Sequence, residues 1–181
     1  GLLLFPMSIG ATCVLVEKAS PDALPAAIAL YRATICYTSP TAYRAMAGQL
    51  VGHDISSLRK CVSAGEALPA ATRQLWRETT GIQMIDGIGS TELLHIFISA
   101  TEDQARGGAT GYVVPGYQAC VLGEEGQPLP PGQVGRLAVR GPTGCKYLAD
   151  ERQRTYVQAG WNLTGDAYLI DPVDGQYVYQ A

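Results

Sequence analysis

Short apolar runs typical of β-strands alternate with segments typical of helices through the first half of the chain, and this alternation constrains the fold more than any other feature. The predicted strands cover residues 11–16, 34–37, 59–64 and 83–88. The predicted helices between them cover residues 20–33, 41–50 and 69–80. Because strand–helix–strand units form parallel sheets with crossover helices, the sequence predicts an α/β subdomain over residues 1–104, part of a larger sheet.

The sequence changes character near residue 105, where glycine and proline turns begin to separate the strand-like runs. The predicted strands of this part cover residues 117–122, 134–140, 161–170 and 176–179, with one short helix at 150–157. Turns at 123–126 and 130–132 are typical of an antiparallel meander. Residues 105–181 are therefore expected to form a second, smaller β-rich subdomain.

Composition excludes several classes of function. The chain has 13 basic and 16 acidic residues, so it lacks the broad basic field that bulk binding of nucleic acid requires. Its longest apolar stretches, such as 1–5 and 23–30, fall short of the roughly 20 residues that span a bilayer. The sequence therefore predicts neither a nucleic-acid partner nor a membrane partner.

The five cysteines form no Cys-x-x-Cys pair, which argues against a disulfide framework or a zinc site and favours a reduced, cytoplasmic setting. Cys13, Cys36 and Cys61 each lie in an apolar strand-like run and are expected to be buried structural thiols. The two histidines, His53 and His95, are too far apart in sequence to indicate a metal pair.

Residues 86–97 concentrate three kinds of chemistry in one stretch. Gly87 and Gly89 allow a tight turn and close approach to a ligand, while Thr91 offers a hydroxyl for phosphate and Glu92 a carboxylate for a hard metal ion. A structural interpretation of the same residues is a glycine turn, a Ser90 cap and a first-turn Glu that open a helix. Ligands of parallel sheets bind beyond the carboxyl ends of the strands, where 37, 64–66 and 87–92 are all expected.

Four motifs in order resemble the adenylate-forming enzymes, which comprise acyl-CoA and aryl-CoA ligases, peptide-synthetase adenylation domains and luciferases. They are Ser-Ala-Gly-Glu-Ala-Leu-Pro at 63–69, Gly-Ser-Thr-Glu at 89–92, Gly-Arg-Leu with Arg-Gly at 135–141, and Leu-Thr-Gly-Asp at 163–166. The resemblance covers essentially the whole chain and implies the large N-terminal domain of that family, whose β-rich part is a distorted barrel. Within the family, residues 86–97 look most like benzoate-CoA and 2-aminobenzoate-CoA ligases.

The resemblance implies a role for each candidate site residue. Thr91 would bond the α-phosphate, Glu92 would ligate Mg²⁺ and Asp166 would accept the ribose hydroxyls, although a turn Asp is the structural alternative for Asp166. The implied adenine-binding residues are Gly65, Glu66, Ala67, Asp86, Gly87 and Ile88. The implied aryl-acid pocket is Tyr37, Ala64, Gly89, His95 and Ile96, with a core histidine as the alternative for His95.

The implied activity is that of an AMP-forming acid–thiol ligase, which uses ATP, Mg²⁺ and coenzyme A to activate benzoate or 2-aminobenzoate. Two alternatives stay open: another acyl-CoA ligase or a carrier-protein-loading adenylation domain, and a non-catalytic nucleotide-binding module. Residues 34–43 contain no acidic side chain that would bind an α-amino group, which argues modestly against an amino-acid substrate.

Two parts of the family pattern are absent from the sequence. None of the three lysines, at positions 18, 60 and 146, follows the Gly-rich Ser/Thr run of the family's phosphate loop, and the C-terminal domain with the catalytic lysine has no counterpart. We therefore expect an internal piece of a longer enzyme that is inactive alone and whose partners include the rest of its own chain. Exposure of the apolar residues 1–5 is expected to favour self-association.

Overall fold

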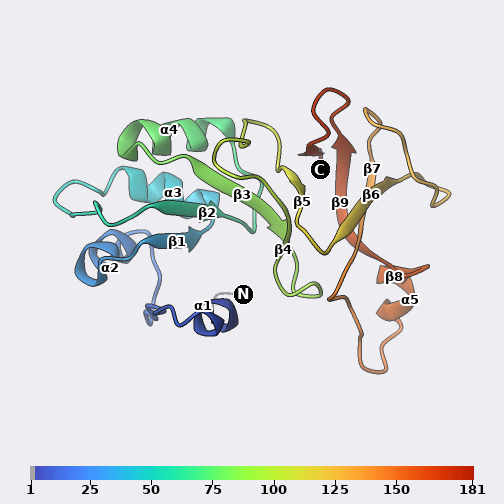
Figure 1. The fold of residues 1–181 in the computed structure, drawn as a ribbon, viewed down its shortest axis with the longest axis horizontal. Coiled ribbons are helices and arrows are strands. Elements are labelled where there is room, and N and C mark those ends of the chain that lie inside the picture. The colour runs from blue at the N-terminus through green and yellow to red at the C-terminus, as the bar shows by residue number, and fades with distance from the viewer. Residues whose placement is uncertain (1–2) are drawn as a thin grey trace. The chain divides into compact units, whose positions relative to one another are not determined.

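The computed structural model describes residues 3–181, which divide into two compact units between Ile85 and Asp86. This division falls inside strand β3 (Met84–Gly89), so one strand belongs to both units (Figure 1). The subdomain boundary near residue 105 stays a prediction. Within residues 3–181, no helix combines the length and apolar character that crossing a membrane requires.

The first unit alternates helices and short strands, as the sequence predicts. Its helices are α1 (Leu4–Ser8), α2 (Ala23–Tyr31), α3 (Pro40–Ala47) and α4 (Ala70–Thr80). Its strands are β1 (Ile35–Thr38), β2 (Lys60–Ser63) and the start of β3. Strands β1 and β2 are parallel and in register from Ile35 opposite Lys60 to Thr38 opposite Ser63. The predicted parallel pair with crossover helices is therefore confirmed, and both strands end at the same edge.

Local signals in the sequence fix the ends of α3 and α4. The hydroxyl of Ser39 accepts a hydrogen bond from the Ala42 N–H at 3.3 Å, and Pro40 occupies the first turn, where its missing N–H costs nothing. Helix α4 ends at Gly81, whose φ of 76° lets its N–H bond the carbonyl of Arg77 at 2.8 Å. Gly81 therefore ends the helix that the sequence predicts over residues 69–80.

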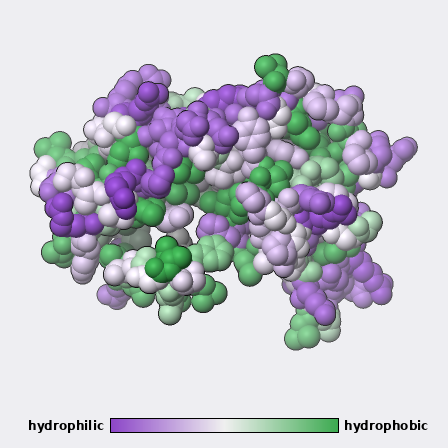
Figure 2. Space-filling view, in the orientation of Figure 1, coloured by the Kyte–Doolittle hydropathy of each residue, from purple (hydrophilic) through white to green (hydrophobic). Residues whose placement is uncertain are grey.

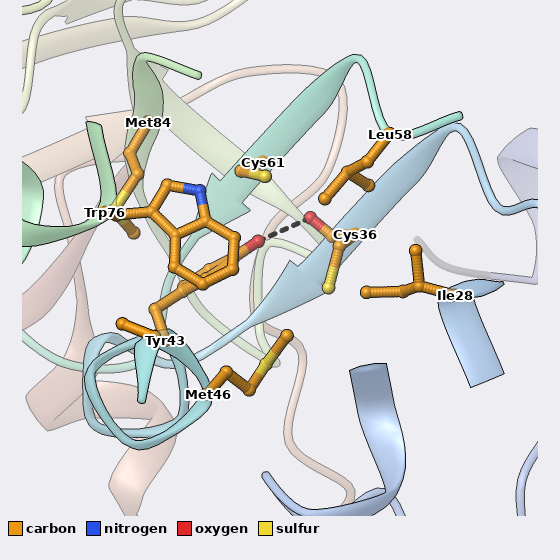
Figure 3. Packing of buried hydrophobic residues seen from close by; sticks show 9 residues of the cluster. Ile28, Cys36, Tyr43, Met46, Leu58, Cys61, Trp76 and Met84 are labelled. Atoms are coloured by element: carbon orange, nitrogen blue, oxygen red, sulfur yellow. Dashed lines mark hydrogen bonds between the residues drawn. The ribbon is translucent and has the colours of Figure 1, made fainter. Parts of the chain in front are cut away.

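The core of the first unit is built around Tyr43 and Trp76, which are both fully buried (Figure 3). Their rings meet edge to face with centroids 4.8 Å apart, a favoured geometry for aromatic pairs. The Tyr43 hydroxyl lies 2.7 Å from the carbonyl oxygen of Cys36 and 3.2 Å from that of Val62, so it is placed to donate to two neighbouring strands. Helix α3 is in this way joined to both β1 and β2.

The buried thiols behave as structural cysteines. Cys36 and Cys61 lie opposite each other in the register of β1 and β2 and are 6% and 0% exposed. Burial raises the pKa of both, that of Cys61 to about 12, so both are neutral thiols near pH 7. The expectation holds for these two. Cys13 is only half-buried and does not lie in a strand.

Residues 3–16 differ from the prediction. Residues 11–16 form no strand, so the first predicted strand of the parallel sheet is absent, and helix α1 before them contains no buried residue. Apolar side chains instead cover α1, where Leu4 is 70% and Met7 62% exposed (Figure 2). An apolar sequence of this kind is typical of a buried segment, but no other part of the described chain packs over these side chains. The predicted exposure of the apolar start is observed for Leu3, Leu4 and Phe5, whereas residues 1 and 2 lie outside the described residues. Self-association stays a prediction.

The second unit is antiparallel throughout its strands. The end of β3 pairs with β4 (Ile96–Ser99), which pairs with β5 (Tyr112–Val113). A further sheet has the order β10-β9-β7-β6, with β8 paired to β9. Its elements are β6 (Gln118–Leu122), β7 (Gly135–Arg140), β8 (Val157–Gln158), β9 (Trp161–Ile170) and β10 (Tyr177–Tyr179), with helix α5 (Arg152–Tyr156) before β8. The predicted antiparallel, β-rich part is confirmed, whereas the antiparallel course of β4 was not predicted.

Replacement of Tyr43 by Phe tests the role of its hydroxyl in joining α3 to the sheet. We expect the free energy of unfolding to fall by about 1–2 kcal/mol, because a buried hydrogen bond is lost without a change in ring packing. Urea denaturation followed by Trp76 fluorescence in a Trp161→Phe background measures it. The control Tyr31→Phe alters an exposed ring and should change stability by less than about 0.5 kcal/mol. Equal effects of the two substitutions would contradict the assignment.

Candidate functional site

The stretch from Ser90 to His95 is a tight turn between two antiparallel strands. Gly89 pairs with Ile96, the Leu94 N–H bonds the Thr91 carbonyl at 3.2 Å, and Leu94 has a φ of 70°. The helix that the sequence pattern suggested after Gly89 is therefore absent. The Ser90 hydroxyl does accept a hydrogen bond from a later N–H, that of Leu93 at 3.2 Å, but the left-handed residue Leu94 ends the turn and sends the chain back into β4.

Leu93 fixes this turn to the body of the second unit. Its side chain is 1% exposed within the core cluster that also holds Phe97 and Leu137. Its carbonyl accepts hydrogen bonds from the Thr143 hydroxyl at 2.8 Å and the Tyr117 hydroxyl at 3.2 Å. Because Leu93 is held by both its side chain and its backbone, its neighbours Thr91 and Glu92 stay exposed at a defined place.

Glu92 presents an ionised carboxylate. Hydrogen bonds lower its pKa, chiefly that from its own backbone N–H, and then those from the hydroxyls of Tyr147 and Ser90. The Tyr147 hydroxyl donates to Glu92 Oε1 at 3.1 Å. Among residues 3–181, no group of three or more His, Cys, Asp or Glu side chains could hold a metal ion. A single exposed carboxylate still fits Mg²⁺ that arrives with a phosphate, since this ion keeps several waters and needs only one or two protein carboxylates.

Gly87 and Gly89 leave room for the start of strand β4, and not only for a ligand. A Cβ on Gly89 would lie 2.6 Å from the carbonyl oxygen of His95, and one on Gly87 would lie 2.8 Å from two side-chain carbons of Ile96. Real Cβ atoms do not approach backbone so closely, so Gly89 is required by the fold. The sequence interpretation assigned Gly89 to the aryl-acid pocket; that assignment stays a prediction.

The structure places the remaining pocket candidates of this unit on or next to β3 and β4. His95 and Ile96 are half-buried at the start of β4, and burial lowers the pKa of His95, which favours a neutral imidazole. Ile88 is half-buried in β3, opposite Ile98. Asp86 is 8% exposed, and its carbonyl accepts a hydrogen bond from the Ser99 hydroxyl at 2.7 Å.

Asp166 lies on a bulge of β9. Ala138 of β7 pairs with Leu163 of β9, and Arg136 pairs with Ala167. Three residues of β9 therefore lie opposite one residue of β7, so β9 carries two extra residues there. The Asp166 N–H bonds the Thr164 hydroxyl at 3.2 Å. A bulge of this kind takes a side chain out of the regular ladder and re-aims it. Asp166 is thereby half-buried rather than paired across the sheet.

Asp166 and Asp86 act on one shared neighbour, Tyr168. Burial is the main cause of the raised pKa of Tyr168, and the negative charges of Asp166 and Asp86 raise it further. The Tyr168 hydroxyl lies 3.2 Å from that of Thr110. Both carboxylates therefore lie near enough to Tyr168 for their charges to act on its hydroxyl.

The first unit holds the other candidates at the carboxyl ends of β1 and β2. Tyr37 is 42% exposed in β1, and Ala64 follows β2 with its N–H 3.4 Å from the Thr38 carbonyl. Gly65 then turns the chain with a φ of 90°, and Gly65, Glu66 and Ala67 are exposed. The Glu66 carboxylate accepts a hydrogen bond from the Thr41 hydroxyl at 2.6 Å. These candidates form one group, as expected for the edge of a parallel pair.

Sequence reasoning missed Leu93, Tyr117, Thr143 and Tyr147, which hold the turn in place. Leu93 offered a signal, since an apolar residue directly after Thr91 and Glu92 suits an anchor. The other three gave none, because their hydroxyls reach the turn only through contacts 24 to 55 residues distant in sequence.

Known proteins resemble this chain in both sequence and fold. The family model described as AMP-binding enzyme matches residues 1–148. The chain belongs to the AMP-binding enzyme family. It is 36% identical to the benzoate–CoA ligase of Thauera aromatica, over 98% of this chain and 34% of that enzyme. The chain thus spans about a third of the length of this relative.

Solved structures of family members share the fold. The anthranilate CoA ligase AuaEII in complex with anthranoyl-AMP is 41% identical, with a TM-score of 0.93 over 99% of this chain and 36% of its own. The benzoate CoA ligase from Burkholderia xenovorans LB400 is 37% identical, with a TM-score of 0.86 over 98% of this chain and 37% of its own. The predicted fold, the N-terminal domain of an adenylate-forming enzyme, is confirmed by these similarities.

A Gly89→Ala substitution tests the close approach between β3 and the start of β4. We expect a loss of about 1–3 kcal/mol of stability, because the new methyl group meets backbone atoms that cannot rotate away. Hydrogen exchange of the amides from 89 to 97 should accelerate. Gly48→Ala is the matched control, since its Cβ would meet no atom within 4 Å, and it should stay within about 0.5 kcal/mol of the parent chain. Unchanged exchange in Gly89→Ala would show that the turn is not constrained there.

Proposed function

We propose that the gene product carrying this chain is an AMP-forming aryl-CoA ligase that activates benzoate or 2-aminobenzoate with ATP and transfers the acyl group to coenzyme A. The observation that carries the proposal is similarity to benzoate and anthranilate ligases at 36% and 41% identity over 98% and 99% of the chain. A cytoplasmic location and the use of Mg²⁺ are parts of the same proposal.

The proposed reaction has two halves. The carboxylate of the aryl acid attacks the α-phosphorus of ATP to give an aryl adenylate and pyrophosphate, and the thiol of coenzyme A then displaces AMP. Negative charge develops around phosphorus in the first half, so preorganised donors and cations supply most of the catalysis. Bound Mg²⁺ would neutralise phosphate charge.

The roles of the residues follow from what each presents. Thr91 offers an exposed hydroxyl donor for the α-phosphate, and Glu92 offers the ionised carboxylate that fits Mg²⁺. Asp166, re-aimed by the β9 bulge, is an acceptor for the ribose hydroxyls. Neutral His95, next to Ile96, suits a pocket that receives an aryl carboxylate, because it supplies a donor in an apolar setting.

An exchange assay with the full-length gene product tests the proposed function. ATP–pyrophosphate exchange is measured with benzoate, 2-aminobenzoate, hydroxybenzoates, medium-chain acids and amino acids, followed by thioester formation with coenzyme A. We expect exchange to be fastest with benzoate or 2-aminobenzoate. A preference for an aliphatic acid or an amino acid would show that the proposed aryl substrate class is wrong. Formation of an adenylate without a coenzyme A thioester would favour a domain that loads a carrier protein. Binding of ATP without any exchange would favour a non-catalytic module.

Replacement of Glu92 by Gln in the same gene product removes the negative charge and keeps the shape. We expect the apparent KM for Mg·ATP to rise at least about tenfold, since tenfold corresponds to only about 1.4 kcal/mol of lost interaction. The dissociation constant of the aryl acid should change by less than about twofold. Glu125→Gln, in an exposed turn between β6 and β7, is the control. Unaltered ATP kinetics in Glu92→Gln would refute the role.

A further inference from the structure

The loop from Gly141 to Leu148 follows β7 and reaches the turn that carries Glu92. Two of its residues make the contact. The Thr143 hydroxyl donates to the backbone carbonyl of Leu93 at 2.8 Å, and the Tyr147 hydroxyl donates to the carboxylate of Glu92 at 3.1 Å. One loop therefore holds both the backbone beside Glu92 and its side chain, within the second unit.

Tyr147 is itself held from several directions. Its backbone N–H donates to the Gln153 side-chain oxygen at 2.8 Å, and its ring lies 6.0 Å from that of Tyr156. The guanidinium of Arg152 lies over the Tyr147 ring, 4.8 Å from the centroid, in a cation–π contact. Arg152 is oriented in turn by two hydrogen bonds to Asp150, at 2.6 and 2.9 Å. The phenol is thus a fixed donor rather than a mobile surface group.

A fixed donor matters because Glu92 is exposed and has a flexible side chain. Ordering a free glutamate on ligand binding costs rotamer entropy, up to about 2 kcal/mol for a side chain of this length. A donor that already holds the carboxylate reduces that cost before the ligand arrives. Partners that orient a metal ligand act in the same way in other metal sites.

We propose that Tyr147 is a positioning residue that holds the carboxylate of Glu92 in its cation-binding orientation. This inference rests on the proposed function, which gives Glu92 its cation. Tyr147 acts through Glu92 and touches neither ATP nor the aryl acid. Removal of its hydroxyl therefore weakens cation binding and leaves binding of the aryl acid unchanged.

The test compares Tyr147→Phe with Tyr156→Phe in the full-length gene product. Tyr156 packs against the Tyr147 ring, with the ring centroids 6.0 Å apart, so removal of its hydroxyl is the matched change in the same aromatic pair. The first measurement, binding of Mn²⁺ in the presence of ATP by electron paramagnetic resonance, needs no turnover. We expect about three- to tenfold weaker binding in Tyr147→Phe, the range for one typical net hydrogen bond, and less than about twofold in Tyr156→Phe.

The second measurement is a double-mutant cycle. Apparent Mg²⁺ constants and aryl-acid KM values are compared for Tyr147→Phe, Glu92→Gln and the double variant. We expect Tyr147→Phe to add less than about twofold to the Mg²⁺ constant once Glu92 is replaced, because the two residues act as one unit.

Equal Mn²⁺ binding in Tyr147→Phe and the parent would overturn the proposal. So would a full additional loss in the Glu92→Gln background, because Tyr147 would then act independently of Glu92. Absence of adenylate formation by the parent protein would instead remove the proposed function, and Mn²⁺ binding would still decide whether Tyr147 positions Glu92.

Discussion

The anchoring of Leu93 is the interaction on which the candidate site depends. Its side chain lies in the core of the second unit, and its carbonyl accepts hydroxyl donors from Thr143 and Tyr117. Burial of one leucine contributes roughly 1.5–3 kcal/mol, and each net hydrogen bond roughly 1 kcal/mol more. These contacts offset part of the conformational entropy that is lost when this six-residue turn, which has no regular structure of its own, becomes ordered. The backbone of Thr91 and Glu92 is therefore held in place while their side chains face solvent.

The two units position their candidate residues in different ways. In the first unit, parallel pairing brings Tyr37 and Ala64 to one edge, so position follows from topology alone. In the second unit, a bulge re-aims Asp166 and hydroxyl donors hold the turn, so position depends on particular side chains. Glu66 combines both, because its loop follows a strand and its carboxylate is held by Thr41. Polar contacts thus supplement the sheets at the Glu66 loop, at the Asp166 bulge and at the turn between β3 and β4.

The sequence predicted what local signals determine. Ser39, Pro40 and Gly81 mark helix ends by their own backbone chemistry, and most strand-like runs became strands within a few residues. Residues 11–16 failed because an apolar run does not specify a partner strand. The helix expected after Gly89 is absent because a Ser cap and a following Glu suit a turn equally well. The turn is held by the hydrogen bond from Thr143 to the Leu93 carbonyl, a contact between residues 50 positions apart in sequence. Tyr147 was missed for the same reason: its link to Glu92 crosses 55 residues.

The bulge in β9 also determines how this strand tolerates change in length. The bulge inserts two residues relative to β7. Because this number is even, the side chains of Leu163 before the bulge and Ala167 after it lie on the same face of the sheet, as they would in a regular strand. A deletion of one residue between them would reverse that facing and send Tyr168, now 2% exposed, toward the opposite side. A deletion of two residues would restore regular pairing between β7 and β9 and keep Tyr168 in the core, but Asp166 would lose its displaced position. Strand β9 thus carries its polar group as an insertion that is separable from the fold.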